Sequence, residues 1–184
     1  MFAVMEPPRV EIGEDVAPVV EAARSGDRAA FDDLYRRFSK SVHAVLLSRL
    51  DPEESREAAQ EVFLTVHRKL GDLQDAAAFG PWVHAIARNL AVTRLRQRRS
   101  RPTEEPLRDV AAPARGDDEL RKRILEVLRS LPEAYRETLM MRLVEGLTGP
   151  EIAAATGLAP ASVRVNLHRG MELLRPLLMK EGWR

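Results

Sequence analysis

The chain has 184 residues, of which 45% are hydrophobic, 5% aromatic and none cysteine, and its 29 Lys and Arg nearly balance its 28 Asp and Glu. This length predicts one ordinary domain or two small ones, and the scarcity of aromatic residues favours helices with Ala/Leu cores over a β-sandwich. The absence of cysteine excludes disulfides, Cys-zinc sites and a thiol nucleophile, and without a run of ~18 apolar residues or a signal peptide we expect a cytoplasmic protein with no membrane insertion.

The first part of the chain predicts a loose tail followed by helices. Residues 1–17 contain prolines, a glycine and scattered acids without periodicity, so we expect no regular structure there. A short helix over 18–24 should end at Ser25 and Gly26, and Asp27 can cap the next helix. That helix should be long, because its apolar residues follow helical spacing: Phe31, Leu34, Tyr35, Phe38, Val42, Val45 and Leu46.

Two further helices should complete an N-terminal domain over residues 18–100. Asp51 followed by Pro52 predicts a helix start, and the buried face of this helix should hold Ala58, Ala59, Val62, Phe63 and Val66. After a loop over 72–78, Pro81 should begin a helix whose buried stripe is Trp82, Val83, Ile86 and Leu90.

The charge is segregated around residue 101. Residues 82–101 carry six Arg and no acid, whereas residues 102–119 carry six acids and two Arg. A chain that binds a polyanion with part of its surface is expected to show this pattern, although a solvated helix end followed by a polar linker would show it too. The prolines and mixed charge over 101–117 predict a flexible linker.

A second, smaller helical domain is expected over residues 118–184. Its first helix should bury Leu120, Ile124, Val127, Leu128 and Leu131. Beyond Pro132 a second helix, ending at Gly146, should bury Leu139, Met140, Leu143 and Val144. The predicted fold class is therefore all-α, with two small helical domains joined by a flexible linker.

Residues 151–167 indicate a helix-turn-helix, an element that DNA-binding proteins place in the major groove. Gly157 can adopt positive φ between the two helices, and Pro160 suits the first turn of the second. If Val163, Leu167 and Leu174 face inward, the outward positions are Ala161, Ser162, Arg164, Val165, His168 and Arg169. On spacing alone, a tight helical hairpin without a DNA-binding role stays open.

Several motifs carry a resemblance to a known family. Residues 131–136 and 141–147, together with the helix-turn-helix, resemble the C-terminal promoter-binding domain of bacterial sigma factors, and residues 31–38, 59–64 and 81–90 resemble the second domain of the same family. The chain is similar to the extracytoplasmic-function (ECF) group of the sigma-70 family. The resemblance implies core RNA polymerase, promoter DNA and an anti-sigma factor as partners, with no cofactor and no metal.

The resemblance also implies three sets of contact residues. Contacts to core polymerase are implied for Glu57, Gln60, Glu61 and Phe63. Contacts to the −10 element are implied for Asp75, Ala77, Phe79, Trp82, Arg88, Asn89, Arg94 and Arg96, although at helical spacing Phe63 and Trp82 also suit the core. Contacts to the −35 element are implied for Arg142, Ala161, Ser162, Arg164, Val165, Asn166, His168 and Arg169.

The chain departs from the family pattern at several of these positions. Thr93 stands where an acid is usual, Val165 and Asn166 where a small polar and a basic residue are usual, and 149–150 where an aromatic and an acid are usual. Ala159 replaces the usual hydroxyl N-cap, which should weaken the helix start by about 0.5–2 kcal/mol. These departures put the preferred promoter sequence in doubt.

Other classes of protein explain less of the sequence. An enzyme would need a catalytic or metal-binding constellation, and the His residues at 43, 67, 84 and 168 lack metal-ligand spacing. A stand-alone helix-turn-helix transcriptional regulator leaves residues 1–100 unexplained, and a helical interaction protein leaves the basic stretch 88–101 unexplained. Only a sigma factor is expected to bind core polymerase in a pull-down.

Overall fold

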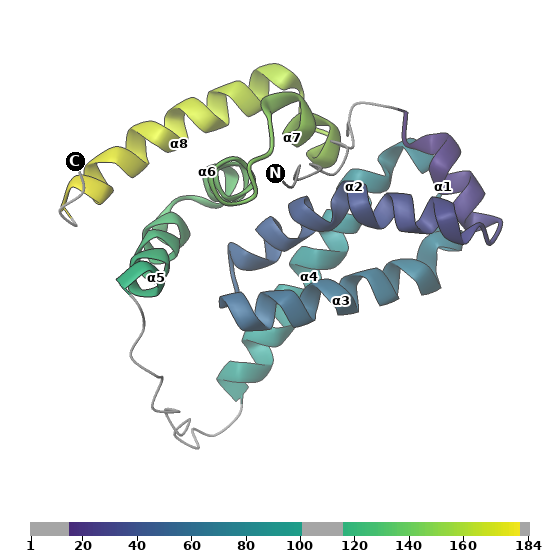
Figure 1. Ribbon diagram of the computed structural model, residues 1–184, viewed down its shortest axis with the longest axis horizontal. Coiled ribbons are helices and arrows are strands. Elements are labelled where there is room, and N and C mark those ends of the chain that lie inside the picture. Colours follow the sequence, from purple (N-terminus) through teal and green to yellow (C-terminus); the bar gives the residue numbers. More distant parts are fainter. Residues whose placement is uncertain (1–14, 101–115, 181–184) are drawn as a thin grey trace, which may run out of the picture.

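The computed structural model describes residues 15–100 and 116–180, and over these ranges the chain is helical and contains no strand (Figure 1). The helices fall into two groups, which we call the N-terminal lobe (residues 15–100) and the C-terminal lobe (residues 116–180). In Figure 1 the C-terminal lobe lies along one side of the N-terminal lobe. The all-α prediction is confirmed.

The N-terminal lobe contains four α-helices and two short 3₁₀ turns. Both aspartates predicted as N-caps have that role, because the Asp27 carboxylate accepts from the Ala29 and Ala30 amides and the Asp51 carboxylate from the Glu54 amide. The elements are α1 (Ala17–Arg24), α2 (Arg28–Leu47), α3 (Pro52–Lys69), η1 (Leu70–Asp72), η2 (Ala76–Ala78) and α4 (Phe79–Ser100).

The helices of this lobe pack around one side of α2, as the apolar stripe predicts. The core takes in Leu34, Phe38 and Val42 of α2 together with Val62 of α3. Tyr35 is a correction, since its side chain is 46% exposed although it lies at a stripe position. The buried face of α2 is therefore narrower than the spacing of its apolar residues predicts.

Part of the predicted loop and helix start in this lobe is wrong. The segment predicted as loop over 72–78 contains the 3₁₀ turn η2, in which the Asp75 carboxylate accepts from the Ala77 amide. Helix α4 begins at Phe79, two residues before Pro81, because proline is tolerated anywhere in the first turn of a helix. The buried stripe of α4 includes Val83, Ala87 and Ala91.

The C-terminal lobe contains the predicted helix-turn-helix. Its elements are α5 (Gly116–Ser130), α6 (Glu133–Leu139), η3 (Met140–Val144), α7 (Gly149–Thr156) and α8 (Pro160–Lys180). Helix α8 extends well beyond the residues 151–167 in which the sequence indicates the helix-turn-helix, and it contains Pro176. Most of the predicted linker 101–117 and of the tail 1–17 lies outside the described residues, but Ala17 belongs to α1 and Gly116 to α5.

The helix after Pro132 changes its winding, which corrects two predicted core positions. Residues 140–144 form a π-helical turn, so the chain takes more residues per turn than an α-helix. As a result Met141 is fully buried, whereas Leu143 and Val144 are exposed at 48% and 36%. A stripe extrapolated at α-helical spacing loses its register at such a turn.

Candidate polymerase and promoter interfaces

The helix-turn-helix is built by local signals. At the start of α7 the Thr148 hydroxyl accepts from the Glu151 amide, and the Glu151 carboxylate accepts from the Thr148 amide at 2.6 Å, forming a capping box. Gly157 ends α7 with φ +71°, as predicted. The Ala159 carbonyl accepts from the Val163 amide, so Ala159 occupies the N-cap position of α8 without offering a side-chain cap.

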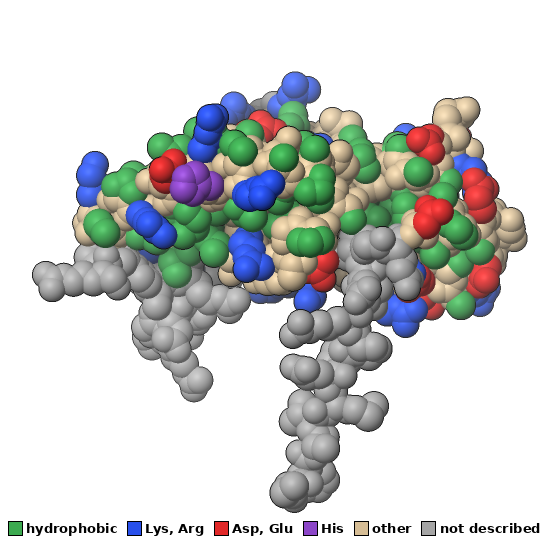
Figure 2. All heavy atoms as spheres, turned by 90° about the horizontal axis from the view of Figure 1, so that it is seen from above, with side chains coloured by type: hydrophobic (Ala, Val, Ile, Leu, Met, Phe, Trp, Pro, Cys, Tyr) green, Lys and Arg blue, Asp and Glu red, His purple; other side chains and the backbone are tan. Residues whose placement is uncertain are grey.

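The outer face of α8 carries most of the residues implied for the −35 element. Val163 and Leu174 are buried on its inner side, and this places the exposed side chains of Ala161, Ser162, Arg164, Val165, His168 and Arg169 on the surface, with Asn166 half-buried. Figure 2 shows Lys and Arg gathered with hydrophobic side chains over this lobe, while acids gather toward α1. A solvent-facing helix with this composition fits a duplex groove.

Arg142, also implied for the −35 element, lies on η3 rather than on the recognition helix. The residue is exposed, and its guanidinium donates to the Leu147 carbonyl at 3.1 Å. That bond closes the turn leading into α7. Its remaining N–H groups leave capacity for a phosphate.

Arg94, which is implied for the −10 element, and the nearby Arg98 are paired with acids of α3 and of its N-cap. Arg94 donates to the Glu61 carboxylate at 2.8 Å and lies 3.7 Å from that of Glu57. Arg98, further along α4, lies 3.5 Å from Asp51 and 3.7 Å from Glu54. The resemblance implies different partners for Glu61 and Arg94, and the structure brings these two residues together.

The other residues implied for the −10 element divide between surface and core. The exposed members are Asp75, Ala77, Asn89 and Arg96. Phe79 is a correction, because its ring is fully buried 4.9 Å from that of Phe38 and so offers no face to a base. Trp82, which at helical spacing also suits the core, is half-buried, and its ring lies 6.0 Å from that of Phe79.

The residues implied for core polymerase share the outer face of α3, with one exception. Glu57, Gln60 and Glu61 are exposed. Phe63 is buried, and its ring lies 4.6 Å from the ring of Tyr35 on α2. Both aromatic side chains line a cavity of about 420 Å³ that Gln60 and Glu145 also border. Gln60 thus lies beside the aromatic pair, whereas Glu57 and Glu61 contact Arg94 of α4.

Arg88 makes a contact that the sequence did not indicate. Its guanidinium forms a fork with the carboxylate of Glu137 on α6, with nitrogen–oxygen distances of 2.9, 3.0 and 3.2 Å. The same carboxylate accepts from Arg49 at 2.7 Å. Burial raises the pKa of Glu137, but the hydrogen bonds and charges of Arg88 and Arg49 outweigh burial and hold that pKa below its ordinary value.

Further polar contacts join the two lobes around this carboxylate. His43 Nδ1 lies 2.6 Å from the Glu145 carboxylate, and Arg129 donates to the backbone carbonyls of Leu47 and Leu50. The sequence did not indicate these contacts because the partners lie far apart in the chain. The capping box was also missed, although the pattern Thr-x-x-Glu at 148–151 signals it in the sequence.

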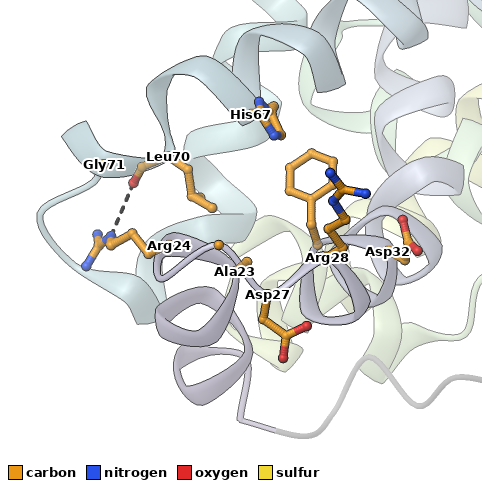
Figure 3. A pocket seen from close by; sticks show the side chains of 10 residues that line it. Ala23, Arg24, Asp27, Arg28, Asp32, His67, Leu70 and Gly71 are labelled. Carbon is orange, nitrogen blue, oxygen red and sulfur yellow. Dashed lines mark hydrogen bonds between the residues drawn. The ribbon is translucent and has the colours of Figure 1, made fainter.

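A separate cavity of about 440 Å³ lies where α1, α2 and α3 meet (Figure 3). Arg24 lines it and donates to the Leu70 carbonyl at 3.2 Å, while Asp27 is engaged in capping α2. Arg24 and Asp27 therefore stabilise the junction of the helices. Within the described ranges, no His, Asp and Glu cluster is suited to hold a metal ion, and no helix is long and apolar enough to span a bilayer.

Comparison with known proteins finds a matching family for each of the two lobes. Residues 34–101 match the family described as Sigma-70 region 2, and residues 121–174 match Sigma-70, region 4. The RNA polymerase sigma factor CarQ of Myxococcus xanthus is 33% identical over 165 residues, covering 86% of this chain and 95% of CarQ. The ECF RNA polymerase sigma factor SigM of Mycobacterium tuberculosis is 32% identical over 166 residues, covering 88% and 84%.

A solved structure also shares the fold. CnrH, in its complex with the cytosolic domain of CnrY, aligns with 91% of this chain and 99% of its own at a TM-score of 0.62 and 21% identity. Region 2, region 4 and relatives above 30% identity coincide over nearly the whole described chain. The chain therefore belongs to the extracytoplasmic-function sigma factors of the sigma-70 family, non-enzymatic initiation factors that bind core RNA polymerase and promoter DNA.

Proposed function

We propose that the two lobes divide the work of promoter recognition. The N-terminal domain, residues 18–100, binds core polymerase through the α3 face of Glu57, Gln60 and Glu61 and captures the −10 element along α4. The C-terminal domain, residues 118–184, binds the −35 element as duplex through α8. The linker 101–117 spans the two, and the protein acts in the cytoplasm.

The observation that carries this proposal is the sidedness of α8. Its inner side is fixed by buried Val163 and Leu174, and its outer side exposes Arg164, Val165 and Arg169 together. Arginines supply phosphate or guanine contacts, and an exposed valine suits a thymine methyl group. A helix that only packed against its neighbour in a hairpin would not require exposed arginines and an exposed valine on its outer side.

Strand opening by this protein would use binding free energy alone. Unstacked bases and phosphates captured along α4 stabilise the open promoter, and cationic side chains such as Arg96 favour single-stranded backbone. We also propose that an anti-sigma factor controls this chain, as suggested by the fold shared with CnrH, a protein solved with the cytosolic domain of CnrY.

Run-off transcription tests the proposal. Purified core polymerase with this chain should yield promoter-dependent transcripts from a library of templates, and no product from any template would refute it. Replacing Glu57 and Glu61 by Ala should weaken core binding, whereas Glu53→Ala, an exposed acid at the start of the same helix, should not. Tight binding of duplex DNA without polymerase would instead favour the stand-alone regulator.

A further inference from the structure

Helix α1 packs against η1 and η2, in the part of the chain where the resemblance implies contacts to the −10 element. We call residues 70–78 the 70–78 segment, and it includes Asp75 and Ala77, both of which are exposed. Buried side chains recur at every third position from η1 to the start of α4, at Leu70, Leu73, Ala76 and Phe79. How this buried row is held therefore decides where the exposed residues between its members lie.

Arg24, in the last turn of α1, holds the first half of the 70–78 segment. Its Nε donates to the Leu70 carbonyl at 3.2 Å, and its Nη2 donates to the Leu73 carbonyl. Figure 3 shows the side chain reaching from α1 to Leu70. Its Nη1 donates to the Glu21 carboxylate of the same helix at 2.7 Å. One planar group thus fixes two carbonyls of the segment relative to α1.

The second half of the 70–78 segment is held by local bonds. The Asp75 carboxylate accepts from the Ala77 amide at 3.0 Å, and the Asp75 carbonyl accepts from the Ala78 amide at 3.0 Å. These bonds set the shape of η2, but they join residues within three positions of each other. They do not tie the segment to another helix, whereas the bonds of Arg24 do.

Arg24 is not itself suited to bind the promoter. All three nitrogens of its guanidinium group already donate to carbonyl or carboxylate oxygens, and its side chain is only 23% exposed. A guanidinium that is engaged in this way presents its donors away from a phosphate. An effect of Arg24 on the promoter would therefore act through the segment that it holds.

We propose that Arg24 is a positioning residue for recognition of the −10 element. It fixes the 70–78 segment, so that the exposed residues of the segment meet the bases of the opened strand in one arrangement. Contacts that depend on a fixed geometry discriminate between bases only when their supports are rigid. This inference rests on the proposed function for the identity of the bound strand, but the hold of Arg24 on the segment is a property of the free chain.

Amide hydrogen exchange of the free chain tests this hold without DNA. Arg24→Met keeps the apolar stem and removes every donor, so exchange over 70–78 should become faster by about fivefold or more. Arg36→Met is the matched control, because Arg36 is exposed and also pairs with an acid three residues earlier, Asp33. It should leave exchange over 70–78 as in wild type. Unchanged exchange in Arg24→Met would overturn the proposal.

Promoter selectivity gives the second readout. On a promoter found by run-off transcription, we compare initiation from that promoter with initiation after replacement of one −10 base. A variant that only lowers the folded fraction lowers both rates equally and leaves their ratio unchanged. Arg24→Met should reduce the ratio by about fivefold or more, because small displacements of a contacting group are costly. The ratio for a −35 replacement should stay as in wild type, and Arg36→Met should change neither.

Arg24→Lys separates the geometry of the side chain from its charge, and it serves if Arg24→Met fails to fold. Lysine keeps the charge but loses the planar fork, so it should reduce −10 selectivity and speed exchange as Arg24→Met does. Wild-type behaviour of Arg24→Lys in both measurements would mean that charge alone is needed and would overturn the proposal, as would unchanged −10 selectivity in a folded Arg24→Met.

The same measurements distinguish failure of this inference from failure of the proposed function. If wild-type protein initiated equally well after every −10 replacement, the proposed capture of the −10 element would be refuted. Faster exchange in Arg24→Met would then still show that Arg24 holds the 70–78 segment.

Discussion

Gly80 of the N-terminal lobe and Ala155 of the C-terminal lobe meet backbone to backbone. A Cβ built at position 80 would overlap the Ala155 carbonyl oxygen and lie 3.2 Å from that of Ala154. Only glycine permits this approach, and it occurs in the first turn of α4. The lobes are thus fitted to each other at main-chain level in addition to the Glu137 ion pairs.

Gly80→Ala should therefore open the lobes without harming the N-terminal lobe. Alanine is favoured over glycine within a helix, so α4 itself should become more stable. The overlap of the added Cβ with the Ala155 carbonyl oxygen should destabilise the contact between the lobes by about 1–3 kcal/mol. Small-angle scattering of the free chain should show a larger radius of gyration. Gly71→Ala is the matched control, because nothing lies within 4 Å of its added Cβ; equal radii for both variants would contradict the prediction.

The capping box at the start of α7 gives a prediction about stability. Thr148→Ala removes the hydroxyl that accepts from the Glu151 amide and should lower the free energy of unfolding by about 0.5–2 kcal/mol. Chemical denaturation measures it. Thr148→Ser should retain stability, and Thr93→Ala, on the exposed part of α4 where the hydroxyl bonds only the Asn89 carbonyl, should cost little. If the denaturation curve of Thr148→Ala superimposed on that of wild type, the Thr148 cap would not contribute to the stability of α7.

The local features of this fold could be predicted because their causes are local. Asp27 and Asp51 cap helices through amides within three residues, and Gly157 ends α7 through its own backbone freedom. Val163 and Leu174 are buried because helical spacing places them on one side. Sequence periodicity and capping chemistry are sufficient for such features.

The features that were missed depend on distant partners or on irregular winding. Nothing near Glu137 in the sequence indicates that Arg49 and Arg88, in another lobe, will surround it. The π-helical turn at 140–144 displaces Leu143 from the predicted core by changing the number of residues per turn. Phe79 follows a segment that resembles a DNA-contacting loop, yet its ring packs against that of Phe38 in the core.

His84 gives a prediction about pH. Its ring is fully buried, with Nε2 2.9 Å from the Ser41 hydroxyl oxygen. Burial lowers the pKa of His84 to about 4, the Arg88 charge adds to this effect, and Glu137 opposes it. In the unfolded chain a histidine titrates near ~6.5, so below that pH the unfolded state binds more protons, and stability should fall between pH ~6.5 and ~4 by up to about 3 kcal/mol.

His84→Gln should flatten this part of the stability curve, since glutamine can still donate to Ser41 but does not titrate. Chemical denaturation from pH 8 to pH 4 measures the slope. His67→Gln, at an exposed histidine of α3, should keep the wild-type slope. If His84→Gln lost stability with acid as steeply as wild type, another group would have to account for the dependence.

The recognition helix gives the last prediction. Arg164 and Arg169 are exposed on α8, so replacing either with Ala removes the hydrogen-bond donors of its guanidinium group without creating a cavity in the core. Each should weaken initiation from a promoter that depends on its −35 element by about 1–3 kcal/mol if it reads a base, or lower the salt dependence of binding by about one counterion if it holds a phosphate. Run-off transcription at several salt concentrations separates the two roles.

Arg175→Ala tests whether position on the helix decides the effect. Arg175 is also exposed on α8 but lies beyond the implied contact residues, so its loss removes the same charge and should change initiation little. Core binding should be unaffected in all three variants, because the surface proposed for polymerase lies on α3. A loss of core binding on replacing Arg164 or Arg169 would mean that α8 belongs to the polymerase contact. An equal effect at Arg175 would mean that general positive charge, and not a defined face of the helix, attracts the promoter.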